Sequence, residues 1–312
     1  MEMWDLVVIG GGVGGCTAAI YGMRYGMKAA IVEMLAPGGQ AATATTIENY
    51  PGFPEGITGP ELARRVHEQA LTFGVEIVSA EATEIVAGAD GKWIVKTSNG
   101  DLETISIIIA TGAYPRSLDV PGEKELRGHG VSYCATCDGF FYRAQTVAVA
   151  GGGNAAAEEA LYLADIAEKV YVIHRRDELR AEQYLQKRLF EAENIEILWN
   201  SVIVAVEGEG AVERLQLRNT QTDELRYVEV QGVFVAIGHI AKTEWLADLL
   251  EIKGGFIVTD ELMRTNQPGI LACGDIRDTP LRQIATAVGD AAIAAFAAHK
   301  YVAEWRAERA SG

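Results

Sequence analysis

The sequence predicts an α/β fold built from two similar units, and the main evidence is an internal repeat. Glycine-rich turns begin at Gly10 and at Gly151, and each turn follows a short apolar strand and precedes a helix. The next strand ends at Glu33 in the first copy and at His174 in the second, which is 23 positions after the first glycine in both. This equal spacing of two strand–turn–helix–strand segments predicts two parallel βαβ units.

Each element of the first unit has its own sequence signal. Uncharged apolar runs predict buried strands, and the Asn99-Gly100 dipeptide between two alternating runs predicts a hairpin. An apolar strand that ends at Gly112 closes the unit. The expected elements are a strand over 6–9, a helix over roughly 15–25, and strands over 29–33, 92–97 and 103–110.

The second unit repeats this order. A buried strand runs into the turn at Gly151, a helix and a second strand follow, and a meander of short alternating strands leads to a closing apolar strand that ends at Gly238. The expected elements are strands over 146–150 and 169–174, a helix to about 164, meander strands over 202–206, 212–218 and 225–230, and a closing strand over 233–238.

The residues after 244 do not begin a third repeat. They predict a short strand over 269–274 and a helix over roughly 282–308, which is rich in alanine and contains no proline. This segment is too small for a domain of ordinary size, so we expect it to pack on the first unit. The predicted domains are therefore 1–117 with 245–312, and 118–244 inserted between them.

Composition limits the class of protein. The 312 residues are enough for about two domains. The 27 basic and 43 acidic residues give a net charge of −16, which argues against a nucleic-acid surface because phosphate binding needs clustered Lys and Arg. The N-terminus has no basic leader, and no apolar run approaches the ~20 residues of a membrane span. We expect a soluble, cytoplasmic protein.

The first glycine turn has the pattern of a nucleotide site. Gly10 permits a tight turn, Gly12 permits close approach of a pyrophosphate, and Gly15 lets the helix pack on the strand. The helix N-terminus then faces the negative charge. Glu33 ends the second strand, where a carboxylate can bind ribose hydroxyls. The motif alone is weak evidence, but strand, helix and acid all stand at the expected spacing.

A long polar loop follows in the first unit. It includes Gln40 and Asn49, whose side chains could reach the edge of an isoalloxazine ring, although a simple surface connection is the alternative.

The second glycine turn differs in the charge that follows it. Its pattern is Gly151-x-Gly153-x-x-Ala156, and its strand ends in His174-Arg175-Arg176, with Arg180 shortly after. A carboxylate here would repel a 2′-phosphate, whereas arginines bind it. The sequence therefore predicts NADPH in preference to NADH, with a solvated basic patch as the alternative. Together with the meanders, the two turns predict an α/β fold with two Rossmann-like (three-layer ββα) dinucleotide-binding domains, the second inserted into the first.

Cys134 and Cys137 form a CxxC pair between the two glycine turns. Such a pair can close a reducible disulfide, and nearby helix dipoles or cations lower its thiol pKa values. Half of a zinc site is the alternative, but a closed zinc site needs four ligands and no second CxxC exists. Asp138 follows the second thiol and could exchange a proton with it, cap the following turn, or do both. Cys16 and Cys273 are expected to be small buried residues without a redox role.

These motifs resemble the class-II pyridine nucleotide-disulfide oxidoreductase family, and within it the low-molecular-weight, bacterial-type thioredoxin reductases. The resemblance covers essentially the whole chain. The segments that carry it are 134–142, 151–154 with 158–160, 174–177, 274–275 and 282–283.

The resemblance implies two cofactors. FAD would lie on the first domain, held by Gly10, Gly12, Gly15, Glu33, Gln40, Asn49, Thr111, Gly112, Asp275, Arg282, Gln283 and Ile284. NADPH would lie on the inserted domain, held by Gly151, Gly153, Asn154, Ala156, His174, Arg175, Arg176 and Arg180.

The resemblance also implies an order of events and a partner. Cys137 would face the flavin, Cys134 would attack thioredoxin, and Asp138 would be the acid. The inserted domain would rotate so that the dithiol serves both, and a homodimer is expected. Thioredoxin would dock near Phe140, Phe141 and His129.

Three positions depart from the usual family pattern. Ile284 stands where a small alanine is common, residues 240–243 replace a Pro-Asn-Thr turn, and His129 stands where a stronger base is frequent. None of these departures removes a reacting group.

Two other functions remain open. One is a flavoprotein reductase of a peroxidase or of another small dithiol protein. The other is a non-catalytic nucleotide sensor or zinc-binding protein, which would be colourless.

Overall fold

The structure is a computed structural model that describes residues 3–35, 37–44 and 46–310. The chain forms two compact units, Met1–Tyr114 with Ala241–Gly312 (the first unit) and Pro115–Ile240 (the second unit). The second unit is therefore inserted into the first, and the predicted fold class is confirmed. The expected domain limits at 117/118 and 244/245 lie three and four residues from the divisions at 114/115 and 240/241.

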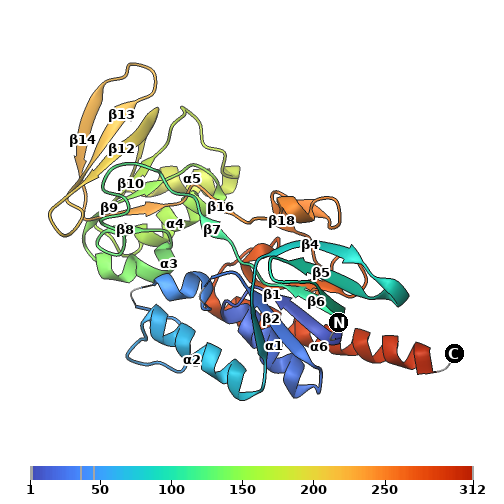
Figure 1. Cartoon of the computed structure of the whole chain (residues 1–312). Coiled ribbons are helices and arrows are strands. Elements are labelled where there is room, and N and C mark those ends of the chain that lie inside the picture. The colour runs from blue at the N-terminus through green and yellow to red at the C-terminus, as the bar shows by residue number, and fades with distance from the viewer. Residues whose placement is uncertain (1–2, 36, 45, 311–312) are drawn as a thin grey trace. The chain divides into compact units, whose positions relative to one another are not determined.

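The first unit contains a seven-stranded sheet with the order β3-β2-β1-β6-β5-β4, and β19 also pairs with β6 (Figure 1). Strand β1 is parallel to β2 and β6, whereas β4, β5 and the start of β6 form an antiparallel meander. Its main elements are β1 (Met3–Ile9), α1 (Val13–Arg24), β2 (Ala29–Glu33), η1 (Gly39–Thr43), α2 (Gly59–Thr72), β3 (Glu76–Ser79), β4 (Ala82–Ala87), η2 (Ala89–Gly91), β5 (Trp93–Thr97), β6 (Leu102–Ile109), η4 (Glu244–Leu246), β17 (Ile252–Lys253), β18 (Phe256–Ile257), β19 (Ile270–Ala272), η5 (Gly274–Ile276) and α6 (Ile284–Ala310).

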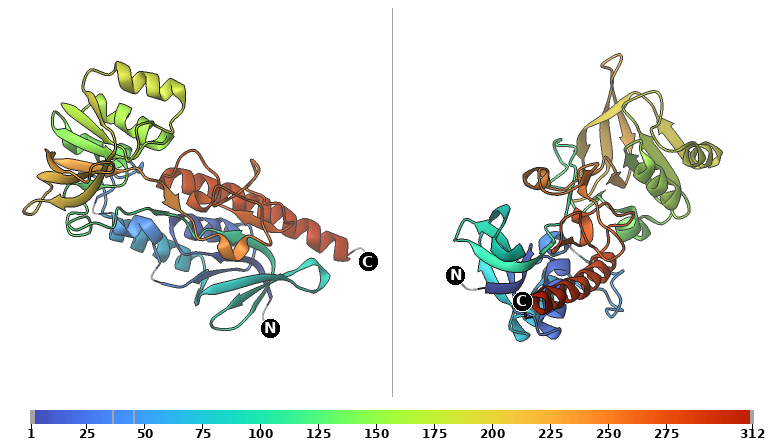
Figure 2. Two further views of the ribbon diagram at one scale, coloured as in Figure 1. Left: turned by 90° about the horizontal axis from the view of Figure 1, so that it is seen from above. Right: turned by 90° about the vertical axis from the view of Figure 1, so that its right-hand side faces the viewer.

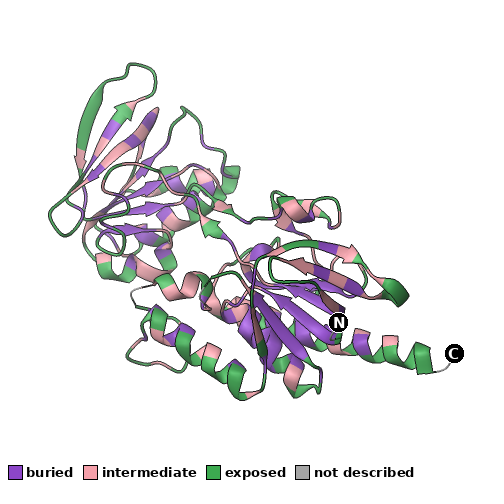
Figure 3. Ribbon diagram, in the orientation of Figure 1, coloured by how far each residue is buried: buried purple, intermediate pink, exposed green. Residues whose placement is uncertain are grey.

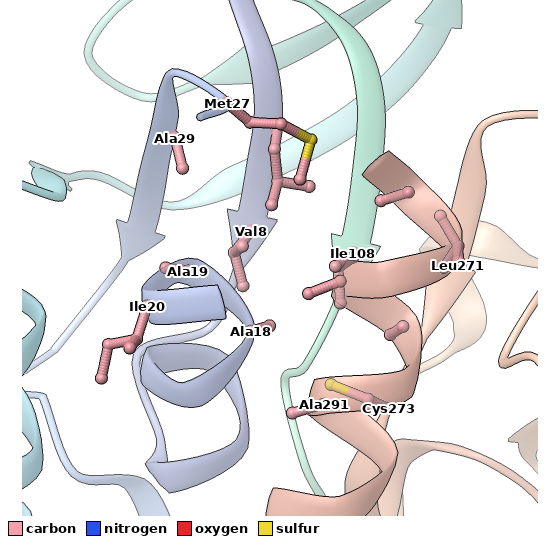
Figure 4. Close-up of a cluster of buried hydrophobic side chains, with 14 of the residues drawn as sticks. Val8, Ala18, Ala19, Ile20, Met27, Ala29, Ile108, Leu271, Cys273 and Ala291 are labelled. Carbon is pink, nitrogen blue, oxygen red and sulfur yellow. The ribbon is translucent and has the colours of Figure 1, made fainter. Parts of the chain in front are cut away.

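Small side chains allow two helices to pack on one face of this sheet. Helix α6, the long red helix in Figures 1 and 2, packs against α1. Figure 4 shows Ala18 of α1 and Ala291 of α6 near Val8 and Ile108 of the central strands, all within one buried cluster. The opposite face is covered by the meander and by residues 246–257. The C-terminal segment therefore contributes to the core of the first unit.

The second unit has the same plan. Its parallel sheet has the order β11-β10-β9-β15-β8, and a three-stranded antiparallel sheet, β12-β13-β14, packs on one face. Helices α3, α4 and α5 contribute to the core on the other face. Its elements are β8 (Val131–Ser132), α3 (Ala135–Asp138), η3 (Gly139–Tyr142), β9 (Thr146–Ala150), α4 (Asn154–Ala164), β10 (Lys169–Ile173), α5 (Gln183–Glu191), β11 (Ile195–Leu198), β12 (Ser201–Glu207), β13 (Arg214–Asn219), β14 (Leu225–Glu229) and β15 (Gly232–Val235). The chain passes between the units at β7 (Tyr114–Pro115) and β16 (His239–Ile240).

Burial follows this layering. The central parallel strands of the two main sheets are buried, while β14 is mostly exposed (Figure 3). Within the described residues, no helix has the length and apolar character needed to cross a membrane.

The last helix starts two residues later than predicted. The hydroxyl of Thr286 accepts the backbone N–H of Gln283 at 3.1 Å, which is the geometry of a cap. Helix α6 therefore begins at Ile284, and Arg282 and Gln283 precede it.

Candidate functional site

The first glycine turn is fixed by backbone contacts that leave no room for side chains. Gly10 has φ of 106°, and a Cβ there would lie 2.5 Å from the carbonyl oxygen of Ala110. A Cβ on Gly15 would collide with the carbonyl oxygen of Gly10. In contrast, a Cβ on Gly12 would meet its nearest atom only at 3.8 Å. The turn is therefore closed on the protein side and open at its middle glycine.

The side chain of Glu33 stabilises this turn through hydrogen bonds to the backbone. Its Oε2 accepts the N–H of Gly11 at 2.6 Å, and its Oε1 accepts the N–H of Leu35 at 2.8 Å. The carboxylate therefore bridges the turn and the end of β2. Each oxygen keeps a second lone pair, so the predicted contact with a ribose stays compatible with these bonds.

Two loop residues predicted for the flavin site occupy the same unit. The amide of Asn49 donates to Oε1 of Gln283 at 3.1 Å, so two residues 234 positions apart meet. Gln40 is the second residue of η1, and the N–H of Gly38, two positions before it, donates to Gly11 O at 2.8 Å. The fold thus brings Gln40 to the glycine turn and Asn49 to the start of α6.

A second group of predicted residues gathers where β6 and β19 end. The hydroxyl oxygen of Thr111 is buried without a hydrogen-bond partner in the described structure, and Gly112 has φ of 69° with open space where a side chain would stand. Burial raises the pKa of Asp275 to about 6, and Arg282 opposes this shift. The Arg282 guanidinium lies 4.1 Å from the centre of the Phe256 ring, and its Nε has no partner within the described residues.

The neighbouring Asp290 was not predicted. Its Oδ2 accepts the N–H of Gly274 at 3.2 Å and lies 3.0 Å from Nε of Arg277. It anchors η5, which carries Asp275. Ile284 packs beside a separate small cluster of Ile47, Ile57 and Leu62.

The second glycine turn repeats the backbone design. Gly151 has φ of 155°, and a Cβ there would lie 2.5 Å from the carbonyl oxygen of Ala236. The ring of His174 fills the space that a Cβ on Gly152 would need. His174 is 4% exposed, its Nε2 lies 2.9 Å from Glu178 O, and burial lowers its pKa. His174 therefore supports the turn and is not presented at the surface with the arginines.

The three arginines that follow are exposed. Their side chains form no ion pair within the part of the chain that the structure describes, and the N–H of Arg180 donates to Gly152 O at 2.7 Å. Asn154 has a different partner, because its Oδ1 accepts the N–H of Glu182 at 2.9 Å and its Nδ2 donates to Glu182 Oε1 at 3.1 Å. The basic side chains and Asn154 thus border the same turn, while Ala156 is fully buried behind it.

The CxxC pair is closed. Cys134 and Cys137 form a disulfide with a Cα–Cα distance of 5.3 Å, and α3 begins between them at Ala135. Disulfide sulfurs are not thiolate metal ligands, so this arrangement suits redox chemistry better than half of a zinc site.

Asp138 directly follows Cys137 and is held by Ser132, a residue that was not predicted to take part in the site. The hydroxyl of Ser132 donates to Asp138 Oδ2 at 2.6 Å and accepts the N–H of Cys134 at 3.1 Å. Burial raises the pKa of Asp138, and the bond from Ser132 opposes this. The alternative that Asp138 caps the next turn is wrong, because its side chain makes no cap bond to η3.

The surroundings of the disulfide include exposed aromatic residues. Phe140 and Phe141 are 61% and 52% exposed, and the guanidinium of Arg143 lies 5.5 Å from the centre of the Phe140 ring. His129 lies on an exposed loop of the same unit. The other cysteines are buried as predicted, and burial raises the pKa of Cys16 and of Cys273 to about 12.

Comparisons with known proteins agree with this geometry. The model of the pyridine nucleotide-disulphide oxidoreductase family matches residues 4–291. The chain therefore belongs to this family, whose members of this type use FAD and NADPH. Within it, thioredoxin reductase of Bacillus subtilis (strain 168) is 42% identical over 305 residues, covering 97% of this chain and 96% of the relative. Thioredoxin reductase of Peptoclostridium acidaminophilum is 43% identical, covering 96% and 98%.

The solved structures point the same way. The crystal structure of thioredoxin reductase from Streptococcus pyogenes has a TM-score of 0.91 and 43% identity, and covers 97% of this chain and 99% of that one. The chain is thus a flavoprotein oxidoreductase whose full-length relatives are thioredoxin reductases.

Proposed function

We propose that this protein reduces the disulfide of thioredoxin with electrons from NADPH, through FAD and the Cys134–Cys137 pair. The observation that carries the proposal is the closed disulfide between these two residues, with a carboxyl held beside it, in the unit that bears the second glycine turn. The relatives named thioredoxin reductase support the same partner.

The first unit, with the predicted limits 1–117 and 245–312, is the proposed FAD domain. Its residues fit the cofactor, because the middle of the glycine turn is open and Thr111 Oγ1 and Arg282 Nε are buried polar atoms that lack partners in the described structure. Gly10, Gly12 and Gly15 would hold the pyrophosphate, and Glu33 the ribose. The remaining proposed ligands are Gln40, Asn49, Thr111, Gly112, Asp275, Arg282, Gln283 and Ile284.

The second unit, with the predicted limits 118–244, is the proposed NADPH domain. A Cβ on Gly153 would meet no atom within 4 Å, so the turn is open there too. Gly151, Gly153, Asn154 and Ala156 would form the phosphate cradle, while His174 would keep the turn in shape. The exposed guanidinium groups of Arg175, Arg176 and Arg180 would bind the 2′-phosphate.

The chain's own residues carry the thiol chemistry. When bound, NADPH and FAD supply the two electrons that open the disulfide. The dithiol centre then takes up two protons, and Asp138 is placed to hold and pass one of them. We assign Cys134 as the thiol that attacks the partner disulfide and Cys137 as the thiol on the flavin side. Ser132 fixes the carboxyl for this exchange through its 2.6 Å bond.

We further propose that thioredoxin docks on the exposed rings of Phe140 and Phe141, near His129. The protein would work as a homodimer in the cytoplasm.

The test is a reconstituted assay with the purified protein, NADPH, thioredoxin and a disulfide dye. We expect a yellow protein and thioredoxin-dependent reduction of the dye. Cys134→Ser and Cys137→Ser should each abolish the reaction, while the buried control Cys16→Ser should retain it. A yellow protein that reduces no thioredoxin, or one that works faster with NADH, would redirect the proposal to another small dithiol protein or a peroxidase.

A further inference from the structure

A half-buried carboxyl that the proposed mechanism does not use lies near the first turn of α3, which begins between the two cysteines. Glu159, on α4, is half-buried, and its carboxyl lies near the backbone N–H of Ala135, the residue that follows Cys134. Its Oε2 is buried and has no hydrogen-bond partner in the described structure. A carboxyl with an unused buried oxygen is costly unless a further proton or donor reaches it.

The packing of α4 on α3 holds this carboxyl in place. Ala135 is fully buried in one cluster with Ala156 and Ala160 of α4. The packing at Gly139 is tight, because a Cβ there would lie 3.0 Å from side-chain atoms of Leu163 and Tyr162 of α4. Helix α4 also begins at the second glycine turn. The same helix therefore connects the proposed NADPH cradle to the first turn of the redox helix.

The charges around Glu159 are acidic. Burial raises the pKa of Glu159 to about 7, the nearby N–H of Ala135 opposes this, and the exposed Glu158 adds to it. Asp138 ends α3 directly after Cys137, and Tyr142 of η3 has its own pKa raised by burial and by Asp138. The other titratable groups on α3 and its N-cap are Cys134 and Cys137 after reduction. A thiolate at either sulfur would make a proton on Glu159 more favourable.

We propose that Glu159 is a positioning residue of the dithiol centre: it fixes the first turn of α3 and holds a proton while the disulfide is reduced. Reduction breaks the S–S bond with two electrons, and the protons taken up are shared among the two sulfurs and the Glu159 carboxylate. When the disulfide forms again, the carboxyl releases its share to solvent. This role rests on the proposed function only in that the disulfide is the redox group.

The test measures the disulfide equilibrium directly. The holoenzyme is equilibrated with mixtures of reduced and oxidised dithiothreitol between pH 5.5 and 8.5, and the state of Cys134 and Cys137 is read by alkylation and peptide mass. Dithiothreitol supplies both electrons and both protons. Glu159→Gln keeps an acceptor for Ala135 but cannot ionise, so it mimics the protonated form at every pH.

We expect a difference that depends on pH. At pH 5.5 wild type and Glu159→Gln should have the same equilibrium constant for reduction. At pH 8.5 the variant should be reduced more readily, by roughly three- to tenfold, which corresponds to half to one pKa unit of coupling. Glu159→Asp keeps a titrating carboxyl and should retain the pH dependence, and the neighbouring Glu158→Gln should stay close to wild type.

Two results would overturn the inference. One is a Glu159→Gln equilibrium that lacks the expected pH-dependent difference from wild type. The other is a rise in KM for NADPH with an unmoved thiol equilibrium, because Glu159 would then act on the nucleotide. The equilibrium measurement needs neither thioredoxin nor NADPH. A wild-type enzyme that fails to reduce thioredoxin would therefore contradict the proposed function and leave the test of Glu159 unaffected.

Discussion

The two glycine turns have the same backbone and different supports. Gly10 and Gly151 both have positive φ, and a side chain on either would press on a carbonyl oxygen, of Ala110 or Ala236, at 2.5 Å. The strand that closes each unit therefore forces glycine at this position in both copies.

The support beneath each turn differs in chemistry. Glu33 accepts the N–H of Gly11, whereas the ring of His174 lies against Gly152 at the equivalent position. Both residues end the second strand and both shape the turn. The residue that ends the second strand therefore stabilises the backbone of the glycine turn in both units, whatever its charge. Charge selection in the second unit therefore falls to Arg175 and Arg176, which follow it.

The largest expected effect comes from substituting the last small residue of each glycine motif, which is Gly15 in the first unit and Ala156 in the second. Gly15→Ala would place a methyl group against the carbonyl of Gly10, so the helix must move from the strand. We expect a loss of about 3 kcal/mol or more in unfolding free energy, together with lost flavin. Ala156→Gly is the matched change in the second unit, and it should cost about 1 kcal/mol. Urea unfolding followed by circular dichroism and flavin absorbance measures both, and equal costs would contradict the asymmetry.

The next effect concerns the arginines that have no counterpart in the first unit. Arg175→Gln or Arg176→Gln should raise KM for NADPH by roughly tenfold or more, because a charge-assisted bond to phosphate contributes about 1.5–3 kcal/mol. KM for NADH should hardly change. Arg188→Gln on α5 removes an exposed arginine elsewhere and controls for net charge. An equal rise in KM for NADH and for NADPH would mean that these arginines do not bind the 2′-phosphate.

The repeat explains why so much of the fold was predictable. Strands β2 and β9 begin and end where the sequence placed them, because a fully apolar run between polar or glycine residues has few alternatives. The start of α6 was not predictable, since it depends on the Thr286 cap. Ser132 and Glu159 could not be predicted from the sequence for another reason. Their contacts with Asp138 and Ala135 arise only when β8 and α4 pack against α3, and no local pattern records that packing.

The smallest expected effect tests the imidazole beneath the second turn. Burial lowers the pKa of His174, so the folded protein binds fewer protons at this site than the unfolded chain. Stability should therefore rise with pH across the window below about 6.5, the ordinary pKa of histidine, and become independent of His174 above it. His174→Gln should flatten this part of the profile of melting temperature against pH by a few degrees at most. The exposed His129→Gln should leave the profile unchanged. A His174 ring that titrates at or above 6.5 by NMR would show that its support of the turn does not depend on the neutral form, and the two supports would then differ in shape but not in charge.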